Sequence, residues 1–199
     1  ISKVQYISNR VGDGLHSTPQ YVDESEFRFI NGNNLISGSI QYFEKTRCVS
    51  EDEYKKYFIP LNEFSLLLSI NGTIGNVSLY KNEKVVLGKS ACYINFQPNI
   101  NVSFMFWLFN SELIQRYFSS KLTGTTIYNL SLDSVWRTPI VLPPKDEQSK
   151  IIKHLKIEDL RISEIIKKEK ARIKLLQEYR QSLISSVVTG KFRVTEDKV

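Results

Sequence analysis

The chain has 199 residues, of which 41% are hydrophobic and 24% are charged, so it fits one globular domain with an appendage. No apolar run approaches the roughly 20 residues that cross a bilayer, and no signal-peptide pattern is seen, so we expect no membrane partner. The net charge of +6 is unevenly placed. Positions 145–191 hold twelve basic and seven acidic residues, whereas positions 1–144 hold thirteen and twelve. Such a basic segment is compatible with nucleic acid, with an acidic protein or with a solvated face.

Positions 1–143 predict a mixed α+β domain with many short strands. Turns rich in Gly and Asn punctuate this region. A short helix that is acidic at its start and basic at its end is predicted at 51–57. Apolar residues at helical spacing predict a helix or a helix pair over 102–119. The clearest predicted strands are 64–70, 76–80, 91–96 and 140–142.

One long helix is predicted over positions 144–190. Pro143–Pro144 closes the domain, because the residue before a proline is pushed out of helical geometry. Gly190 suits a left-handed cap, and we expect 191–199 to be a loose tail. A kink or short break is expected at 156–159, where an acidic residue falls in the apolar ladder.

The long helix carries the apolar seam of a coiled coil. Apolar residues recur every seven positions with Glu169 as the misfit, and a second ladder follows four residues on. The chain has no other long helix to cover this seam, so we expect a partner helix. The predicted dimerisation residues are Leu155, Ile162, Ile166, Ile173, Leu176 and Leu183.

No catalytic residue and no metal site is predicted. His16 lies in a Gly/Ser/Thr loop and suits a base contact, a catalytic base or an ordinary surface residue, whereas His154 reads as a solvated helix residue. No phosphate loop and no zinc-type spacing is present. Cys48 and Cys92 lie in strand-like segments, so we expect two buried, reduced thiols in a cytoplasmic protein.

The polar loops offer a second kind of chemistry. Glycines let the backbone approach a ligand, and the loop side chains offer hydrogen bonds to phosphates and base edges. Aromatic residues that could stack are Tyr21, Tyr42 and Tyr128. Polar turns have this composition in many proteins, so the loops alone do not establish DNA binding. The candidate basic clusters are Lys45, Arg47, Lys55 and Lys56, and Lys81, Lys84 and Lys89.

The order of five segments is more specific. They are GDGLHSTPQY (12–21), FINGNNLISGSI (29–40), LLLSINGTIGNVSLY (66–80), GTTIYNLSLDSVWRTPIVLPPKDEQSKI (124–151) and IKLLQEYRQSLISSVVTGKF (173–192). This order resembles one target-recognition domain and its trailing helix from the specificity subunit of a type I restriction–modification enzyme. The resemblance covers nearly the whole chain, although the leading segment is cut to ISKVQYI.

The resemblance implies a fold, a role and partners. In that family the subunit has two such halves, each of which reads one part of a split double-stranded DNA target, and the two helices pack antiparallel as a spacer. The subunit holds methyltransferase subunits, which bind S-adenosylmethionine, and through them the restriction subunits; no cofactor is expected in this chain. We therefore expect a half-subunit that dimerises through its long helix, or the distal half of a longer chain. The TGKF ending favours the end of a protein.

The resemblance and the loop chemistry together predict two kinds of DNA contact. Lys45 and Arg47 are assigned to phosphates. The residues assigned to DNA bases are His16, Ser17, Thr18, Asn71, Thr73, Lys89, Ser90, Thr125, Thr126, Tyr128 and Asn129.

Two other functions remain open at this point. One is a coiled-coil interaction protein with no DNA role. The other is the recognition domain of a fused methyltransferase, although the chain shows neither an N-P-P-Y-type motif nor a Gly-rich cofactor loop. The target DNA sequence is not readable from these residues.

Overall fold

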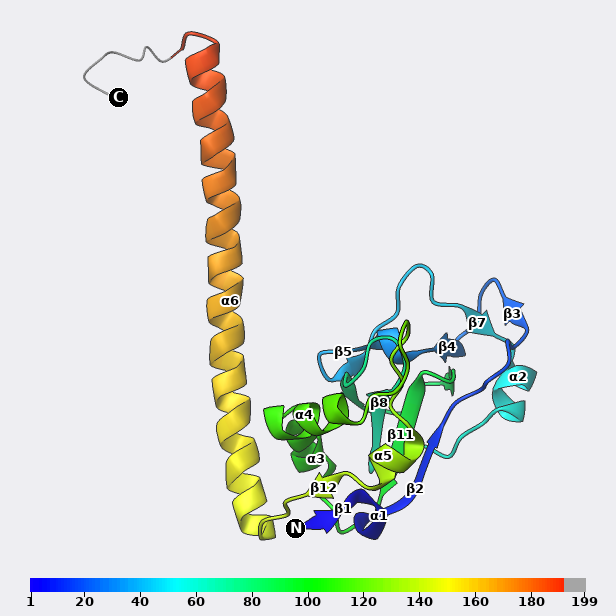
Figure 1. Cartoon of the computed structure of the whole chain (residues 1–199). Helices are drawn as coiled ribbons and strands as arrows, with labels where there is room; N and C mark the ends of the chain where they lie inside the picture. Colours follow the sequence, from blue (N-terminus) through cyan, green and yellow to red (C-terminus); the bar gives the residue numbers. More distant parts are fainter. Residues whose placement is uncertain (192–199) are drawn as a thin grey trace. The chain divides into compact units, whose positions relative to one another are not determined.

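The computed structural model describes residues 1–191 and divides the chain into two compact units, one spanning Ile1–Ile152 and one beginning at Lys153. The first unit combines several sheets with short helices, so the predicted α+β class is confirmed (Figure 1). The helices before α6 are α1 (Val4–Ile7), α2 (Glu51–Lys56), α3 (Val102–Phe109), α4 (Glu112–Ser120) and α5 (Leu132–Trp136), with a 3₁₀ turn η1 (Gly32–Asn34).

An antiparallel four-stranded sheet forms the centre of the first unit. Its strand order is β2-β11-β8-β9, and β8 pairs with β11 through Leu67 and Tyr93. The strands predicted at 64–70, 76–80 and 91–96 are confirmed as three of these four. Their bounds are β2 Ser8–Asp13, β8 Ser65–Ser69, β9 Val77–Leu79 and β11 Ala91–Phe96.

Three smaller sheets complete the strand pairing. One has the order β10-β4-β7-β3, in which β10 and β4 are parallel. The strand predicted at 140–142 is shifted, because its partner β1 pairs only with Pro139 and Ile140. The bounds are β10 Val85–Leu87, β4 Arg28–Ile30, β7 Cys48–Val49, β3 Tyr21–Val22, β5 Leu35–Ile36, β6 Ser39–Ile40, β1 Ser2–Lys3 and β12 Pro139–Ile140.

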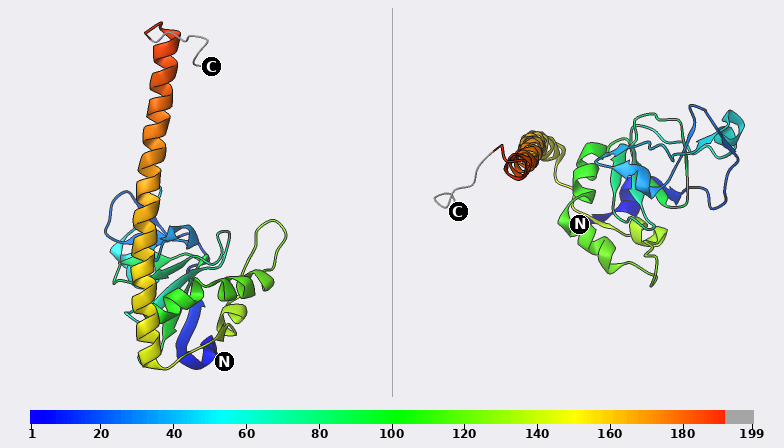
Figure 2. Two further views of the ribbon diagram at one scale, coloured as in Figure 1. Left: turned by 90° about the vertical axis from the view of Figure 1, so that its left-hand side faces the viewer. Right: turned by 90° about the horizontal axis from the view of Figure 1, so that it is seen from above.

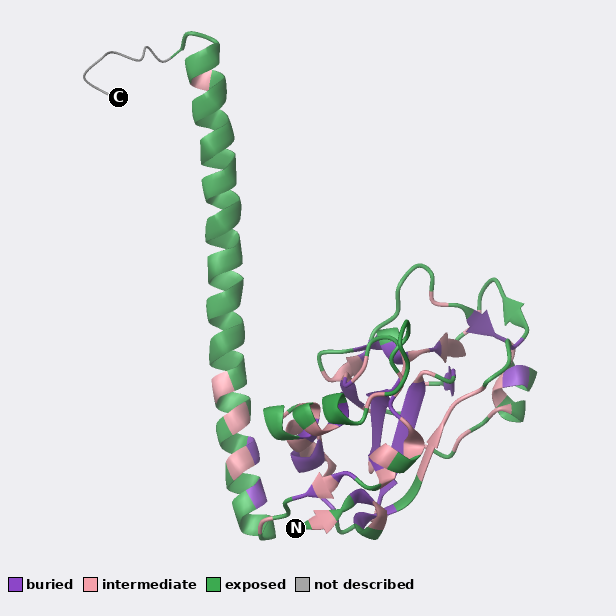
Figure 3. Cartoon of the chain, in the orientation of Figure 1, coloured by how far each residue is buried: buried purple, intermediate pink, exposed green. Residues whose placement is uncertain are grey.

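The central strands are buried on both faces (Figure 3). Successive strand residues point to opposite faces, so Leu66 and Leu68 enter one core whereas Leu67 enters another. The first core includes Phe109 of α3 and Phe118 of α4, and the second is formed largely by the small strands. Figure 2 shows α3 and α4 (green) on one side of the central strands and the strands between residues 28 and 49 (blue to cyan) on the other. This double burial explains why the strand sequences are apolar runs without alternation.

Local capping sets the helix ends that the sequence predicts. The α2 helix begins where the main-chain N–H of Glu53 donates to Ser50 Oγ at 3.2 Å. The prediction of a helix pair over 102–119 is confirmed, because α3 and α4 separate at Asn110 and Ser111. The Ser111 hydroxyl donates to the Leu108 carbonyl at 2.6 Å and helps to end α3.

The long helix α6 spans Lys145–Val188 and runs through 156–159 without a break. Asp159 is exposed there, so its carboxylate stays in water and does not interrupt the helix. Gly190 follows the helix with φ of +74°, as a left-handed cap requires. Apart from Lys191, the tail predicted at 191–199 lies outside the described residues.

The first unit extends past the expected boundary at Pro143–Pro144. Gln148 and Ile152, in the first two turns of α6, are 4% and 8% exposed, and Ile152 belongs to the first core. The Gln148 amide also donates to the Pro143 carbonyl at 2.8 Å. The start of α6 is therefore part of the domain core.

Both cysteines are buried and free, as predicted. Cys48 is 4% exposed and Cys92 is fully buried in β11. Burial raises the pKa of the Cys92 thiol, so it remains uncharged at neutral pH. Separately, none of the helices in residues 1–191 combines the length and the hydrophobicity that crossing a bilayer requires.

Candidate nucleic-acid interface

Several loops leave the same end of the central sheet. Asp13, the last residue of β2, pairs with Cys92, and Ser69, the last residue of β8, pairs with Ala91 at the start of β11. Because β2 and β8 both run antiparallel to β11, the segments that follow β2 and β8 and the segment that precedes β11 meet at the same end of the sheet. We call the segments 14–18, 70–73, 88–90 and 123–129 the loop surface.

Main-chain hydrogen bonds join these loops to one another. The N–H of Lys89 donates to the Leu15 carbonyl at 3.0 Å, and the N–H of Ile70 donates to the Ser90 carbonyl at 3.0 Å. The N–H of Gly72 in turn donates to the Tyr128 carbonyl at 3.3 Å. The loop surface is therefore one connected structure, although its segments are far apart in the sequence.

The predicted base-contact residues all lie on this surface, in two groups. The β2 loop and the turn before β11 form one group, and the loops around Asn71 and Asn129, which form a β-bridge, form the other. Asn71, Ser90 and Asn129 are partly buried. The exposed members are His16, Ser17, Thr18, Thr73, Lys89, Thr125, Thr126 and Tyr128.

Two of these side chains are held by neighbours within the domain. The Ser90 hydroxyl accepts from the main-chain N–H of Gly32 at 2.9 Å and donates to Asn31 Oδ1 at 3.0 Å. Its one hydrogen is used there, so Ser90 supports the loop and is poorly placed to donate to a base. His16 Nε2 lies 2.7 Å from Asp13 Oδ2, which orients an imidazole whose side chain is 69% exposed.

Ion pairs divide the basic residues into two classes. Lys55, Lys56 and Lys84 pair with acidic neighbours at 2.8, 3.1 and 2.7 Å. Within residues 1–191, Lys45 and Arg47 form no salt bridge, nor does Lys89. Unpaired cations keep their charge available for phosphates and base edges.

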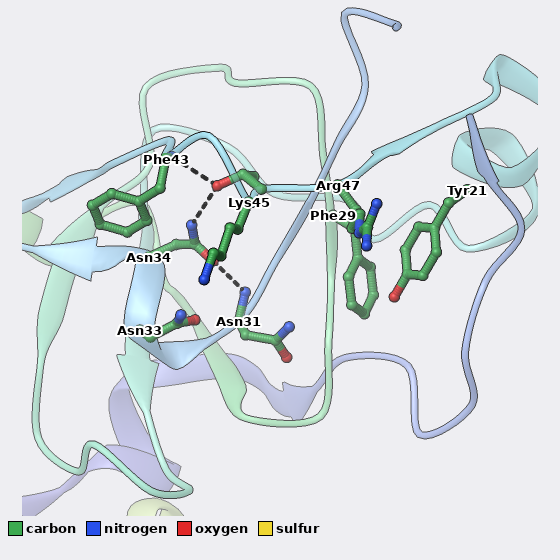
Figure 4. Close-up of a pocket in the computed structure, with 9 residues that line it drawn as sticks. Tyr21, Phe29, Asn31, Asn33, Asn34, Phe43, Lys45 and Arg47 are labelled. Carbon is green, nitrogen blue, oxygen red and sulfur yellow. Dashed lines mark hydrogen bonds between the residues drawn. The ribbon is translucent and has the colours of Figure 1, made fainter. Parts of the chain in front are cut away.

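Lys45 and Arg47 flank a pocket of about 140 Å³ (Figure 4). It adjoins the loop surface through the bond between Ser90 and Asn31. The sequence alone gives no DNA-contact residue within 29–40, because only the fold brings that segment beside 43–47. The lining residues are Tyr21, Phe29, Asn31, Asn33, Asn34, Phe43, Lys45, Thr46 and Arg47.

Solved structures with the same fold come from type I restriction–modification systems. One is the S subunit from M. genitalium, with 18% identity, a TM-score of 0.56 and 92% of this chain aligned to 45% of that one. Another is the HsdS subunit from Thermoanaerobacter tengcongensis, with 16% identity, a TM-score of 0.59 and coverage of 82% and 43%. A third is a chain of a type I R-M system analysed for complex assembly and conformational transition, with 13% identity, a TM-score of 0.68 and coverage of 92% and 44%.

The sequence itself assigns the family. This chain spans less than half the length of the solved structures that it resembles. No functionally curated protein matches it. The profile of the type I restriction modification DNA specificity domain matches residues 16–175, which are most of the chain and include the loop surface from His16 onward, the pocket and most of α6. The chain therefore belongs to the family of type I restriction–modification DNA specificity domains.

Proposed function

We propose that this chain reads one part of a split double-stranded DNA target as a non-catalytic, cytoplasmic specificity subunit. In this proposal α6 pairs with an equivalent helix, from a second copy or from another half-subunit. The methyltransferase subunits, which carry S-adenosylmethionine, assemble on this scaffold, and restriction subunits bind through them.

The observation that carries the proposal is the connected loop surface. Base pairs differ in the hydrogen-bond donors and acceptors along their groove edges. A protein that reads a DNA sequence therefore needs donor and acceptor side chains on one surface. The loop surface offers amides, hydroxyls and an imidazole, with the unpaired Lys45, Arg47 and Lys89 on or beside it. Such a surface can read bases and neutralise phosphates together.

The exposed seam of α6 supports the assembly part of the proposal. The seam residues from Ile162 to Leu183 are 41–58% exposed, which is unusual for large aliphatic side chains in a regular pattern (Figure 3). Burying each one in a helix pair is worth about 1.5–3 kcal/mol. A second long helix would supply that burial.

Methylation mapping tests the reading of DNA. The assembled methyltransferase would carry the chain with Asn129→Ala, Tyr128→Ala or Lys45→Ala, and methylated positions would be mapped across a genome. A lost base contact should relax one position of the motif, because it costs about 1–3 kcal/mol against the correct base only. Loss of Lys45 should weaken binding to every sequence and lower the salt slope by about one.

Lys55→Ala is the matched control for Lys45→Ala. Lys55 already pairs with Glu51 at 2.8 Å, so replacing Lys55 should change the salt slope much less than replacing Lys45 does. If all three test variants keep the wild-type motif and salt dependence, the loop surface is not the DNA-binding face.

A further inference from the structure

We propose that Arg47 reads a guanine edge in the pocket that it shares with Tyr21 and Asn31. The sequence alone assigns Arg47 to a phosphate, and the pocket geometry points to a base instead. This inference rests on the proposed function, since it names one specificity-determining residue within the DNA-reading surface.

The guanidinium of Arg47 is held in place by an aromatic pair. It lies 5.8 Å from the centroid of the Tyr21 ring, and that ring packs edgewise on Phe29 with centroids 5.9 Å apart. The main-chain N–H of Phe29 also donates to the Arg47 carbonyl at 2.9 Å. Figure 4 shows the Arg47 side chain beside these two rings, with no dashed bond to a residue drawn. Arg47 is thus oriented before DNA arrives, and the entropy cost of binding is lower.

The amide of Asn31 is also oriented. Its Oδ1 accepts from the Ser90 hydroxyl at 3.0 Å, which fixes which end of the amide is the acceptor. Among the described residues its Nδ2 donates no hydrogen bond, and Figure 4 shows this side chain directed toward Phe29. The pocket therefore presents free N–H donors from both Asn31 and Arg47.

Asn34 fixes the wall between these groups. It is 5% exposed, and its Oδ1 accepts from the main-chain N–H of Asn31 at 2.9 Å. Its Nδ2 donates to the Gln41 carbonyl at 2.8 Å and to Thr46 Oγ1 at 3.2 Å. This buried amide joins η1 to the segment that carries Lys45 and Arg47, so the spacing of the two pocket walls is set by the fold.

The chemistry of the pocket favours a guanine over a phosphate. The guanidinium fork matches the O6 and N7 acceptors of guanine, the commonest specific contact of arginine with DNA. An exposed amide such as Asn33 offers both donors and an acceptor, as the edge of a base pair does. Lys45 is the better phosphate ligand, because its ammonium is a point charge without the planar fork of arginine. Figure 4 shows its amine apart from Arg47.

The test measures binding of the assembled wild-type and variant complexes to two kinds of duplex. One carries the motif found by methylation mapping, and the others replace each guanine of that motif in turn. Arg47→Ala should weaken binding to the motif roughly 5- to 150-fold, the span of one lost base contact, while leaving one substituted duplex almost unaffected. Arg47→Lys keeps the charge but loses the planar fork, so it should keep the salt slope and lose preference at the same guanine.

Matched variants separate the possible results. Arg116→Ala removes an arginine that pairs with Glu112, and it should leave both affinity and preference unchanged. If Arg47→Ala weakens every duplex by one factor and lowers the salt slope by about one, Arg47 contacts a phosphate and the inference is wrong. Unchanged binding of both Arg47 variants also refutes it. A wild-type complex without any sequence preference would refute the proposed function itself.

Discussion

Glu53 joins two segments of the domain through one carboxylate. Its side chain is 10% exposed; it accepts from the main-chain N–H of Gln20 at 3.1 Å and from the Lys56 amine at 3.1 Å. The hydrogen bond from the Gln20 N–H has the largest effect on the pKa of Glu53, and the hydrogen bond from the Lys56 amine has the second largest. Both lower this pKa below its ordinary value. This bond anchors the end of the segment that begins in the loop surface.

Glu53→Gln should therefore reduce stability in a pH-dependent way. A lowered folded-state pKa means that the carboxylate stabilises the fold above its unfolded pKa of about 4.3 and loses this effect as pH falls through the folded value. The variant should be less stable than wild type at pH 7, and the difference should shrink below about pH 4. Urea unfolding of both proteins across this range measures it. Glu63→Gln, at an exposed site, is the control, and equal pH curves for both variants would contradict the assignment.

The segment 123–129 depends on a backbone conformation that favours glycine. Gly124 has φ of +98°, and an added Cβ would overlap the Ile127 carbonyl oxygen. Thr123 and Asn129 exchange main-chain hydrogen bonds of 2.9 and 3.0 Å across this loop. The position of Tyr128 and Asn129 on the loop surface therefore depends on Gly124.

Gly124→Ala should weaken DNA binding, whereas Gly190→Ala, outside the loop surface, should not. Both variants cost roughly 1–2 kcal/mol for a positive φ, but a Cβ at Gly190 has no atom within 4 Å. Only the Gly124 variant must displace its loop. Affinity for the methylated motif and the midpoint of urea unfolding would be measured together. Equal affinities at equal stability would show that this loop does not contact DNA.

The seam of α6 should drive self-association. The double variant Ile166→Asp and Leu176→Asp places two charges within the apolar seam and should be monomeric. Each aliphatic side chain buried in the helix pair contributes about 1.5–3 kcal/mol to the free energy of dimerisation. Leu160 and Leu175 are 68% and 65% exposed and lie away from the seam on the helix, so Asp at these two positions is the matched control. Sedimentation of the wild type, the seam variant and the control variant measures their oligomeric states. A wild-type monomer would contradict the homodimer, and an unchanged dimer in the seam variant would contradict the seam.

At the scale of the whole chain, the domain ends within α6 and not before it. A chain that stops at Pro144 loses the buried Ile152 and the hydrogen bond from Gln148 to Pro143. We expect it to be about 2–5 kcal/mol less stable than a chain that stops at Lys156, the usual cost of emptying such a core site. Urea unfolding of the two truncated chains measures this difference. Equal stabilities of the two truncated chains would show that the domain ends at Pro143–Pro144.

Local features determined much of this protein from its sequence alone. The long helix over 145–188, apart from the break expected at 156–159, the short helix α2 and the strand at 91–96 follow from local sequence patterns. The short helices α1 and α5 and the two-residue strands other than β12 were not predicted, because segments this short carry too little periodic signal. Their boundaries are set by pairing with distant residues, as β12 shows with β1.

The candidate site depended on tertiary structure. The sequence placed polar loops and basic residues, but only the fold brings Glu26 to Lys84 across 58 positions and leaves Lys45 without an ion pair among residues 1–191. Likewise, Arg47 meets Tyr21, and Asn31 meets Ser90, across long stretches of chain. Periodicity and capping act between near neighbours and are readable in order along the chain. The residues that line this pocket come from position 21 and from segments 29–34 and 43–47, which only strand pairing brings together. The geometry of the pocket was therefore decided by the tertiary structure.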